Sequence, residues 1–163
     1  MGKKLTSRAI AACMVALCAG CAQGPSMTDV QAYAKSQAKS LVVGNESKAT
    51  TKQSAKAQDG YDNAGYANGQ GVAINEASQV AIGKRNQVHA DQQARAEGGS
   101  HNSGVLNGNA VASNAIEQAA IGRGNRLEGE QSAKAEGASY IRGSGSGNAV
   151  SANQGRQVAI RGR

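Results

Sequence analysis

The side chains that most often do chemistry in proteins are scarce in this sequence. His89 and His101 are its only histidines, and the residues 39 places before and after His89 are Thr50 and Glu128, so this position does not require an imidazole. No Ser/His/Asp set recurs, and Gly122-Arg123-Gly124-Asn125 is not followed by the helical pattern that a phosphate-binding glycine loop needs. The sequence therefore predicts that the chain is not an enzyme and uses no metal and no cofactor.

All the cysteines lie near the N-terminus, at Cys13, Cys18 and Cys21. The chain begins with a positively charged segment that contains Lys3, Lys4 and Arg8. The apolar run 9–17 follows, and it is too short to span a bilayer as a mature helix. These features predict an export signal over residues 1–20. Its removal would leave Cys21 as a single thiol that cannot form an internal disulfide.

The segment Leu17-Cys18-Ala19-Gly20-Cys21 resembles a bacterial lipobox. The resemblance implies that Cys21 becomes the first residue of the mature chain and is lipidated, with acyl chains such as palmitate. Several acyl chains would hold the protein stably on a membrane, since one chain alone is marginal. Ala22 follows where an inner-membrane retention signal typically carries Asp, so by resemblance to enteric lipoproteins the expected location is the cell outer membrane. The lipid-anchored chain is expected to be surface-exposed there. The alternative is cleavage near the same place and free secretion.

A repeat organises the rest of the chain. Ala81-Ile82-Gly83 returns as Ala120-Ile121-Gly122 and, with a changed last residue, as Ala159-Ile160-Arg161, at a spacing of 39 residues. One further step back reaches Val43. This spacing predicts a repeat domain over residues 42–163, with units 42–80, 81–119 and 120–158 and a partial unit 159–163. With 22 Gly, no Trp and no Phe the composition resembles that of disordered chains, but disorder does not require a fixed register.

Within the repeats, small and branched apolar residues alternate with polar ones, as in Gln79-Val80-Ala81-Ile82 and Ala94-Arg95-Ala96-Glu97. This alternation is the period of a β-strand. Helical repeats of similar length would need leucine-rich faces and few glycines. The predicted fold is therefore all-β, a β-solenoid of 39-residue repeats whose coils stack about 4.8 Å apart.

Stacking would place like residues above one another in columns. Two columns are predicted to point inward, the first formed by Val43, Ile82, Ile121 and Ile160 and the second by Ala49, Val88 and Leu127. A ladder of side-chain amides is predicted for Gln53, Gln92 and Gln131. Lys56, Arg95 and Lys134 would form a basic column.

A finer motif, G-x-x-N-x5-Q, contains Asn86, Asn125 and Asn148 and is completed by Gln92, Gln131 and Gln154. It resembles the curlin repeat of bacterial curli and, more loosely, the repeats of the Fap amyloid subunits. The resemblance covers roughly residues 42–160. It implies a β-solenoid that adds subunits end to end into an extracellular functional amyloid, a fibril for cell adhesion and biofilm formation.

Residues 21–41 stand apart from the repeats. Thr28-Asp29-Val30-Gln31 has the form of a capping box, and the apolar residues after it are spaced roughly as on a helix. A short N-terminal helix that caps the first coil is one interpretation. A flexible tether between the lipid and the solenoid is the other.

Charge bears on possible partners. Removal of Lys3, Lys4 and Arg8 with the signal lowers the formal net charge from +7 to +4. From Gly137 onward there are four arginines and no carboxylate, so this end could meet an anionic polysaccharide or simply discourage uncontrolled edge pairing. The export signal and the shortage of aromatic residues argue against nucleic acid.

Together these features predict a structural surface lipoprotein of the curlin-like type that acts in adhesion, in fibre nucleation or anchoring, or in biofilm formation. A lipid anchor suits a tethered nucleator better than a subunit that must leave the membrane. Its partners would be the membrane, through the N-terminal lipid, and further copies or other fibre subunits. The alternative is a non-polymerising β-solenoid lipoprotein, a monomer or trimer, that binds an envelope or matrix polysaccharide.

Overall fold

A computed structural model describes residues 8–19, 28–59, 64–101 and 103–161 of the chain. The described residues form strands and turns, and they contain no helix. The strands are β1 (Arg8–Ala19), β2 (Thr28–Val43), β3 (Lys48–Asp59), β4 (Ala64–Ile82), β5 (Gln87–Glu97), β6 (Ser103–Ile121), β7 (Arg126–Glu136), β8 (Arg142–Ser146) and β9 (Ala149–Ile160).

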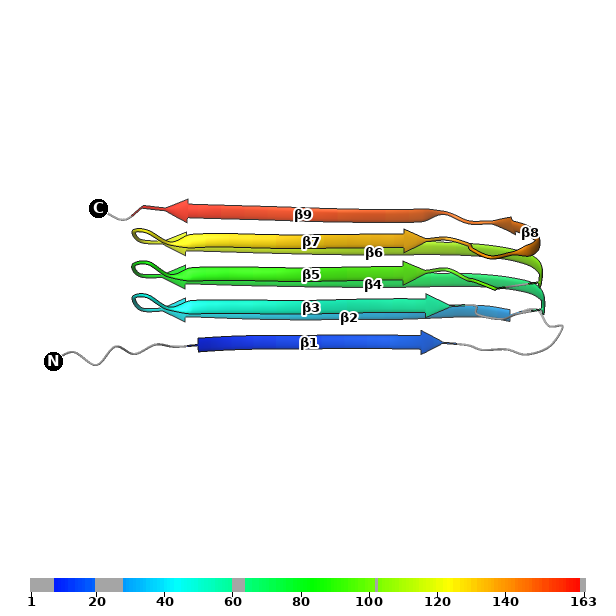
Figure 1. Cartoon of the computed structure of the whole chain (residues 1–163), viewed down its shortest axis with the longest axis horizontal. Helices are drawn as coiled ribbons and strands as arrows, with labels where there is room; N and C mark the ends of the chain where they lie inside the picture. Colours follow the sequence, from blue (N-terminus) through cyan, green and yellow to red (C-terminus); the bar gives the residue numbers. More distant parts are fainter. Residues whose placement is uncertain (1–7, 20–27, 60–63, 102, 162–163) are drawn as a thin grey trace.

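The strands form two parallel sheets that lie against each other (Figure 1). Sheet A has the order β1-β3-β5-β7, and sheet B has the order β2-β4-β6, after which β8 and β9 both pair with β6. The chain alternates between the sheets, so β2 and β3 make coil 1, β4 and β5 coil 2, β6 and β7 coil 3, and β8 and β9 the first half of coil 4. The protein is a β-solenoid, as the sequence predicted.

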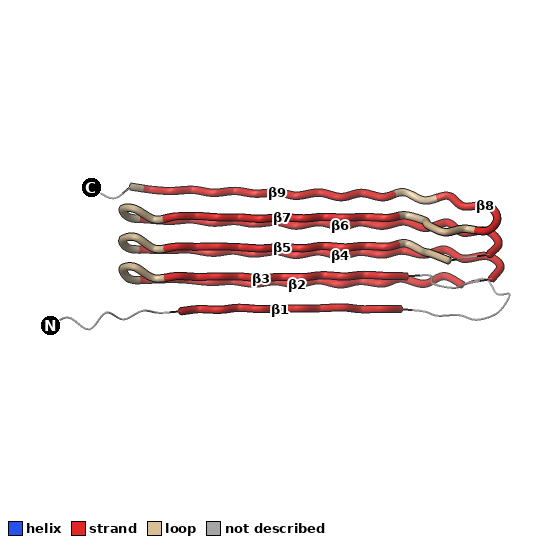
Figure 2. Tube along the Cα trace, viewed as in Figure 1, coloured by secondary structure: helices blue, strands red, loops and turns tan. Residues whose placement is uncertain are grey.

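Successive coils are in register at the predicted spacing of 39 residues: Val43 pairs with Ile82, Ile82 with Ile121, and Ile121 with Ile160. The turns from sheet B to sheet A stack at one end of the solenoid (Figure 2). Gly83 in one of these turns has φ +132°, and a Cβ atom there would lie 1.8 Å from the carbonyl oxygen of Gly44 in the coil below. Only glycine allows the turns to approach this closely.

The N-terminal helix considered for residues 21–41 is wrong for the described part of that segment, because residues 28–43 form β2. A flexible tether is wrong for the same residues. β2 pairs with β4 in the same 39-residue register, with Ala34 beside Ala73 and Ala38 beside Ala77. Ala32, Ala34 and Ala38 are buried, so burial of one face against the core determines the strand structure of this segment. The repeat therefore begins before residue 42.

The core between the sheets is lined mainly by alanine. Its largest cluster combines alanines of sheet B, such as Ala34 and Ala73, with alanines of sheet A, such as Ala57 and Ala96. Side chains that are both large and fully buried include Leu106 but also Gln79, Gln92 and Gln118. Buried amides must find hydrogen-bond partners, so polar ladders supply part of the interior of this solenoid.

Candidate functional site

The predicted column of branched residues stacks as expected but points outward, which corrects the prediction that it faces the core. Val43 is 64% exposed, Ile82 38%, Ile121 42% and Ile160 55%. The neighbouring column faces inward instead, and it contains Val42, Ala81 and Ala120.

The strand period explains this correction. On β4, the side chains of Glu76 and Ile82 lie on the same face of the sheet, because their positions in the strand differ by an even number. An inward Ile82 would therefore place the Glu76 carboxylate in an apolar core, which is strongly unfavourable without a charged partner. Because the Glu76 carboxylate must stay in contact with water, Ile82 lies on the outer face with it. On sheet A, the inward column of Ala49, Val88 and Leu127 packs against the inward column of sheet B.

The glutamine ladder on sheet A comes together in the interior. Gln92 Nε2 donates to Gln53 Oε1 at 2.7 Å, and Gln131 Nε2 donates to Gln92 Oε1 at 3.2 Å. Gln92 Nε2 also lies 3.1 Å from the carbonyl oxygen of Ala115 on sheet B. The ladder therefore ties successive coils together and also links the two sheets.

Two further amide ladders on sheet B were missed by the sequence analysis. In the first, Gln118 Nε2 donates to Gln79 Oε1 at 2.8 Å and Gln157 Nε2 to Gln118 Oε1 at 2.7 Å. In the second, Asn75 Nδ2 donates to Asn114 Oδ1 at 3.0 Å and Asn114 Nδ2 to Asn153 Oδ1 at 2.9 Å. Identical amides at a spacing of 39 residues, on the alternate positions that also carry alanine, were the signal that could have revealed them.

The asparagines of the G-x-x-N-x5-Q motif do not form one column. Asn86 and Asn125 lie in equivalent turns, where Asn86 Oδ1 accepts from the Ser47 backbone N–H at 3.0 Å and Asn125 Oδ1 accepts from the Asn86 N–H at 2.9 Å. Asn148 lies between β8 and β9 and stacks on Asn109, whose Oδ1 is 3.3 Å from the Asn148 backbone nitrogen. The motif therefore describes two different places in the coil.

The outer faces of both sheets carry charges. On sheet A, Lys134 Nζ lies 2.6 Å and Arg95 Nη2 3.9 Å from the Glu136 carboxylate. The hydrogen bond from Lys134 is the main cause that lowers the pKa of Glu136. The charge of the basic column formed by Lys56, Arg95 and Lys134 is therefore partly neutralised by Glu136 at Arg95 and Lys134.

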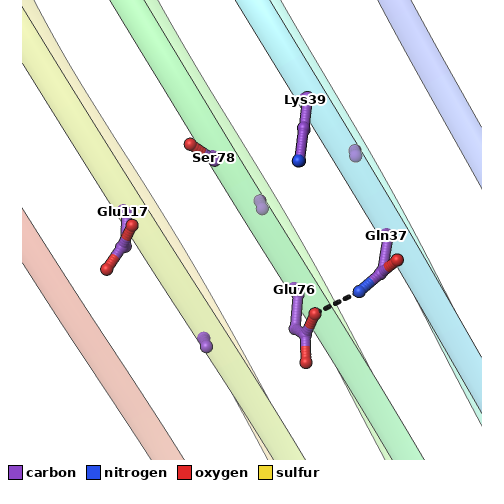
Figure 3. A pocket seen from close by; sticks show the side chains of 8 residues that line it. Gln37, Lys39, Glu76, Ser78 and Glu117 are labelled. Atoms are coloured by element: carbon purple, nitrogen blue, oxygen red, sulfur yellow. Dashed lines mark hydrogen bonds between the residues drawn. The ribbon is translucent and has the colours of Figure 1, made fainter.

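On sheet B, a shallow hollow spans β2, β4 and β6, and Figure 3 shows Gln37, Lys39, Glu76, Ser78 and Glu117 around it. Gln37 donates a hydrogen bond to Glu76 (Figure 3), and Lys35 Nζ lies 3.1 Å from the same carboxylate. Both contacts lower the pKa of Glu76, the hydrogen bond from Gln37 most. The hollow is open and mixed in charge, and its described side chains do not form a catalytic arrangement.

The two ends of the stack differ in how well the core is covered. Inward residues of β3 and β5, such as Ala55, Gln92 and Ala94, are at most 3% exposed. Their counterparts on β7, among them Gln131 and Ala133, are only half-buried, and the residues of β9 are exposed throughout. β1 pairs with β3 at the other end. Among the described strands, β7 pairs with β5 alone, so the described stack has an open cross-section beside β7 and β9, which is called its C-terminal end below.

The edge of β7 is also open for backbone pairing. The Glu136 carbonyl accepts from the Gly98 N–H at 2.9 Å, so Glu136 faces the coil below. In a parallel strand the N–H and C=O of one residue point the same way and alternate along the strand. The groups of Leu127, Gly129, Gln131, Ala133 and Ala135 therefore face away from β5. On β9 the Ile160 carbonyl accepts a hydrogen bond from the Gly122 N–H of β6's following turn. The backbone N–H and C=O groups of Ala159, and of every second residue before it, therefore point away from β6.

The remaining candidate residues have no arrangement that indicates chemistry. His89 Nδ1 lies 3.5 Å from a Glu128 carboxylate oxygen, and His101 stacks on Tyr140. Among the described residues, no group of three or more His, Cys, Asp and Glu side chains is placed to hold a metal ion. No helix of the described chain has the length and apolar character needed to cross a bilayer. Cys21, the predicted lipidation site, lies outside the described residues.

Comparisons with known proteins add no family assignment. No protein-family model matches the chain. Neither the curated proteins nor the solved structures gave a match. The fold and the open C-terminal end are therefore the observations on which a functional proposal must rest.

Proposed function

We propose that this protein is a non-enzymatic, lipid-anchored surface protein of the curlin-like type, which acts in adhesion and biofilm formation by anchoring or nucleating fibres. The observation that carries the proposal is the open cross-section at the C-terminal end. There Leu127, Gln131 and Ala133 are half-buried, while their equivalents on β5, which lies between β3 and β7 and does not depend on β1, are buried. Solenoids normally cover such an end with a polar cap, so this end is suited to strand addition.

The anchor in this proposal is Cys21, the residue that follows the predicted export signal. Acylation there would place coil 1 next to the outer membrane and leave coil 4 as the distal end. This polarity supports a tethered base for a fibre, because the open cross-section points away from the membrane. In the Cys21→Ser variant the protein should leave the membrane fraction or remain as an uncleaved precursor. A processed Cys21→Ser protein that stays in the membrane would contradict the anchor.

The proposal is tested by closing the open edge of β9. Ser151 and Ala159 both face the open side, so the double variant Ser151→Pro/Ala159→Pro removes edge N–H groups without removing a β6–β9 hydrogen bond. Bacteria that produce this variant should keep the protein in the outer membrane but lose fibres and surface attachment. The matched control is Ser151→Ala/Ala159→Ser, which keeps both N–H groups.

A non-polymerising polysaccharide binder remains the second candidate, and one observation favours it. The outer face of β3 carries Lys48, Lys52 and Lys56, each exposed and spaced by four residues, which is about 13 Å along a strand. This lysine row could follow an anionic sugar chain. If attachment survives Ser151→Pro/Ala159→Pro but is lost when the three lysines become glutamine, the binder replaces the fibre anchor.

A further inference from the structure

The outer faces of the two sheets differ in apolar content. Every outward position of β3, β5 and β7 in sheet A carries a polar or charged residue. On sheet B, by contrast, exposed apolar side chains form columns that cross all the described coils. Contiguous exposed apolar surface marks contact sites on proteins, so the outer face of sheet B is the face on which a partner is expected.

Two of these columns lie near opposite ends of the sheet B strands. The turn-side column lies beside the turns from sheet B to sheet A and contains Val43, Ile82, Ile121 and Ile160. The far column contains Tyr33, Val72, Val111 and Val150. Tyr33 is 51% and Val150 55% exposed. The ten residues between the columns correspond to about 33 Å along a strand, so the columns frame the face.

Polar and charged side chains occupy the strip between the two columns (Figure 3). Lys39 lies there in coil 1, Glu76 in coil 2 and Glu117 in coil 3. Against a lipid surface, these carboxylates would meet hydrocarbon or anionic headgroups, which is unfavourable. A protein face with both signs of charge can accommodate the strip, and the outer face of sheet B itself has this property.

A second copy of this face complements the first around a two-fold axis that is parallel to the stack of coils. Each coil then faces the same coil of the second copy, with the strands of the facing sheets antiparallel. If the axis lies midway between the columns of Gln37 and Lys39, Ile82 faces Val72 of the second copy and Ile121 faces Val111. The turn-side column of each copy therefore covers the far column of the other.

The same arrangement keeps like charges apart. The facing pairs in the strip are Lys39 with Gln37, Glu76 with Ser78, and Glu117 with Ala115. Among these described positions, no two like charges stand directly opposite each other. Lys39 lies one coil from Glu76 of the second copy, close enough for an ion pair. Glu117 also lies one coil from Glu76 of the second copy, and Arg156 follows Glu117 in its own column.

The other two-fold arrangement, with the axis parallel to the strands, fits the charges less well. It reverses the order of the coils, so coil 1 of one copy faces coil 4 of the other. Lys39 would then stand against Arg156 of the second copy. Like charges directly opposite each other are destabilising, so the charges favour the axis parallel to the stack.

The face is large enough for a stable dimer. Residues 31–43 and their equivalents extend about 40 Å along the strands, and the four strands β2, β4, β6 and β9 extend about 19 Å across them. A flat contact over this area buries about 800 Å² on each copy, the size of a standard stable interface. Because a two-fold contact uses the same face of both copies, it closes without adding a third.

We propose that the protein forms a two-fold dimer through the outer face of sheet B, with each coil facing the same coil of the second copy. Coil 1 of both copies then lies at one end of the dimer and coil 4 of both at the other. The inference goes beyond the proposed function, because a fibre anchor requires no second copy beside it, and each can fail without the other.

The facing residues of coil 2 provide a matched pair of variants. In Val72→Lys/Ile82→Lys each facing pair contains two lysines, whereas in Val72→Glu/Ile82→Lys it contains a glutamate and a lysine. Within one chain these positions are about 33 Å apart, so their charges meet only across the dimer. Both side chains point outward and are partly exposed, so both variants should keep the β-rich circular dichroism of the unchanged chain.

Sedimentation equilibrium of the full chain in mild detergent measures the dissociation constant of the dimer. We expect the unchanged chain to be dimeric. The dissociation constant of Val72→Lys/Ile82→Lys should exceed that of Val72→Glu/Ile82→Lys at least about a hundredfold, a factor of about ten for each of the two facing pairs. Equal constants, or a monomeric unchanged chain, would overturn the inference. A monomer that binds phosphatidylglycerol vesicles through Ile82 would overturn it in favour of a lipid surface.

A second measurement keeps the test valid if either double variant fails to fold. A photoreactive amino acid replaces Val111, and isotopically labelled and unlabelled copies are mixed so that crosslinks between copies can be recognised by mass. The proposed dimer predicts a crosslink from position 111 to the segment around Ile121 of the second copy. A crosslink to Val72 of the second copy would indicate the reversed order of coils, and that result, or the absence of crosslinks between copies, would overturn the inference.

Discussion

The side of the sheet on which each column lies can be tested with one pair of substitutions, Ala120→Asp and Ile121→Asp. Ala120 is 1% exposed and packs with Val42 and Ala81 in an apolar cluster. An aspartate there has no charged partner in the cluster and adds volume where alanine fits. We estimate a loss of roughly 4 kcal/mol in the free energy of unfolding, from an unpaired buried group at about 2–3 and overpacking at about 1–2.

Ile121 is the neighbouring residue, but it is 42% exposed. Its aspartate would reach water, and the loss is limited to the partial burial of the isoleucine against the same column, about 1 kcal/mol. Urea unfolding followed by circular dichroism measures both variants. Equal destabilisation, or a larger effect at Ile121, would refute the assignment of the inner and outer faces.

Three further predictions concern the ladders, the turns and the outer charges. Gln92→Leu should lower stability by about 3 kcal/mol, because it leaves buried ladder groups unpaired, whereas exposed Gln93→Leu should be nearly neutral in the same urea titration. Gly83→Ala should loosen the stacked turns and speed their hydrogen exchange, because the added Cβ would lie 1.8 Å from a carbonyl oxygen of the coil below. Gly129→Ala should be accepted, because the atom nearest to its added Cβ would be 3.5 Å away. The lowered pKa of Glu76 means that its contribution is present above the unfolded value of 4.5 and is lost as the pH falls through the lower folded value. Glu76→Gln should therefore reduce the small loss of stability between pH 6 and about pH 3; an unchanged acid profile would contradict the role of this carboxylate.

The fold could be predicted because its determinant is periodic. A constant spacing of 39 residues with strand alternation requires stacked coils, and the pairing of Ile82 with Ile121 follows directly. The same periodicity leaves open which side faces inward. Size favoured Ile82 for the interior, but Glu76 on the same side and the alanine-lined core decide for Ala81.

The extension of the solenoid through β2 could not be predicted as well, because this strand departs in composition from the later ones. Serines replace the ladder amides at Ser36 and Ser40, and the capping-box residues imitate a helix start. The alternation of Ala32, Ala34, Ser36 and Ala38 was the informative signal, and it was obscured by apolar residues at roughly helical spacing. The open end could not be predicted, because it depends on which sheet each strand joins, and strand order within a coil is a three-dimensional property.

The role of the open C-terminal end is tested most directly by photo-crosslinking in intact cells, with a photoreactive amino acid in place of Leu127 on β7. The control probe replaces Ser132, which lies on the exposed outer face of the same strand. The proposed fibre anchor predicts a crosslink from position 127, but not from 132, to a strand of a fibre subunit. It also predicts that Ser151→Pro/Ala159→Pro weakens this crosslink. Attachment of cells to surfaces without any crosslink from position 127, or with equal crosslinks from both positions, would contradict it.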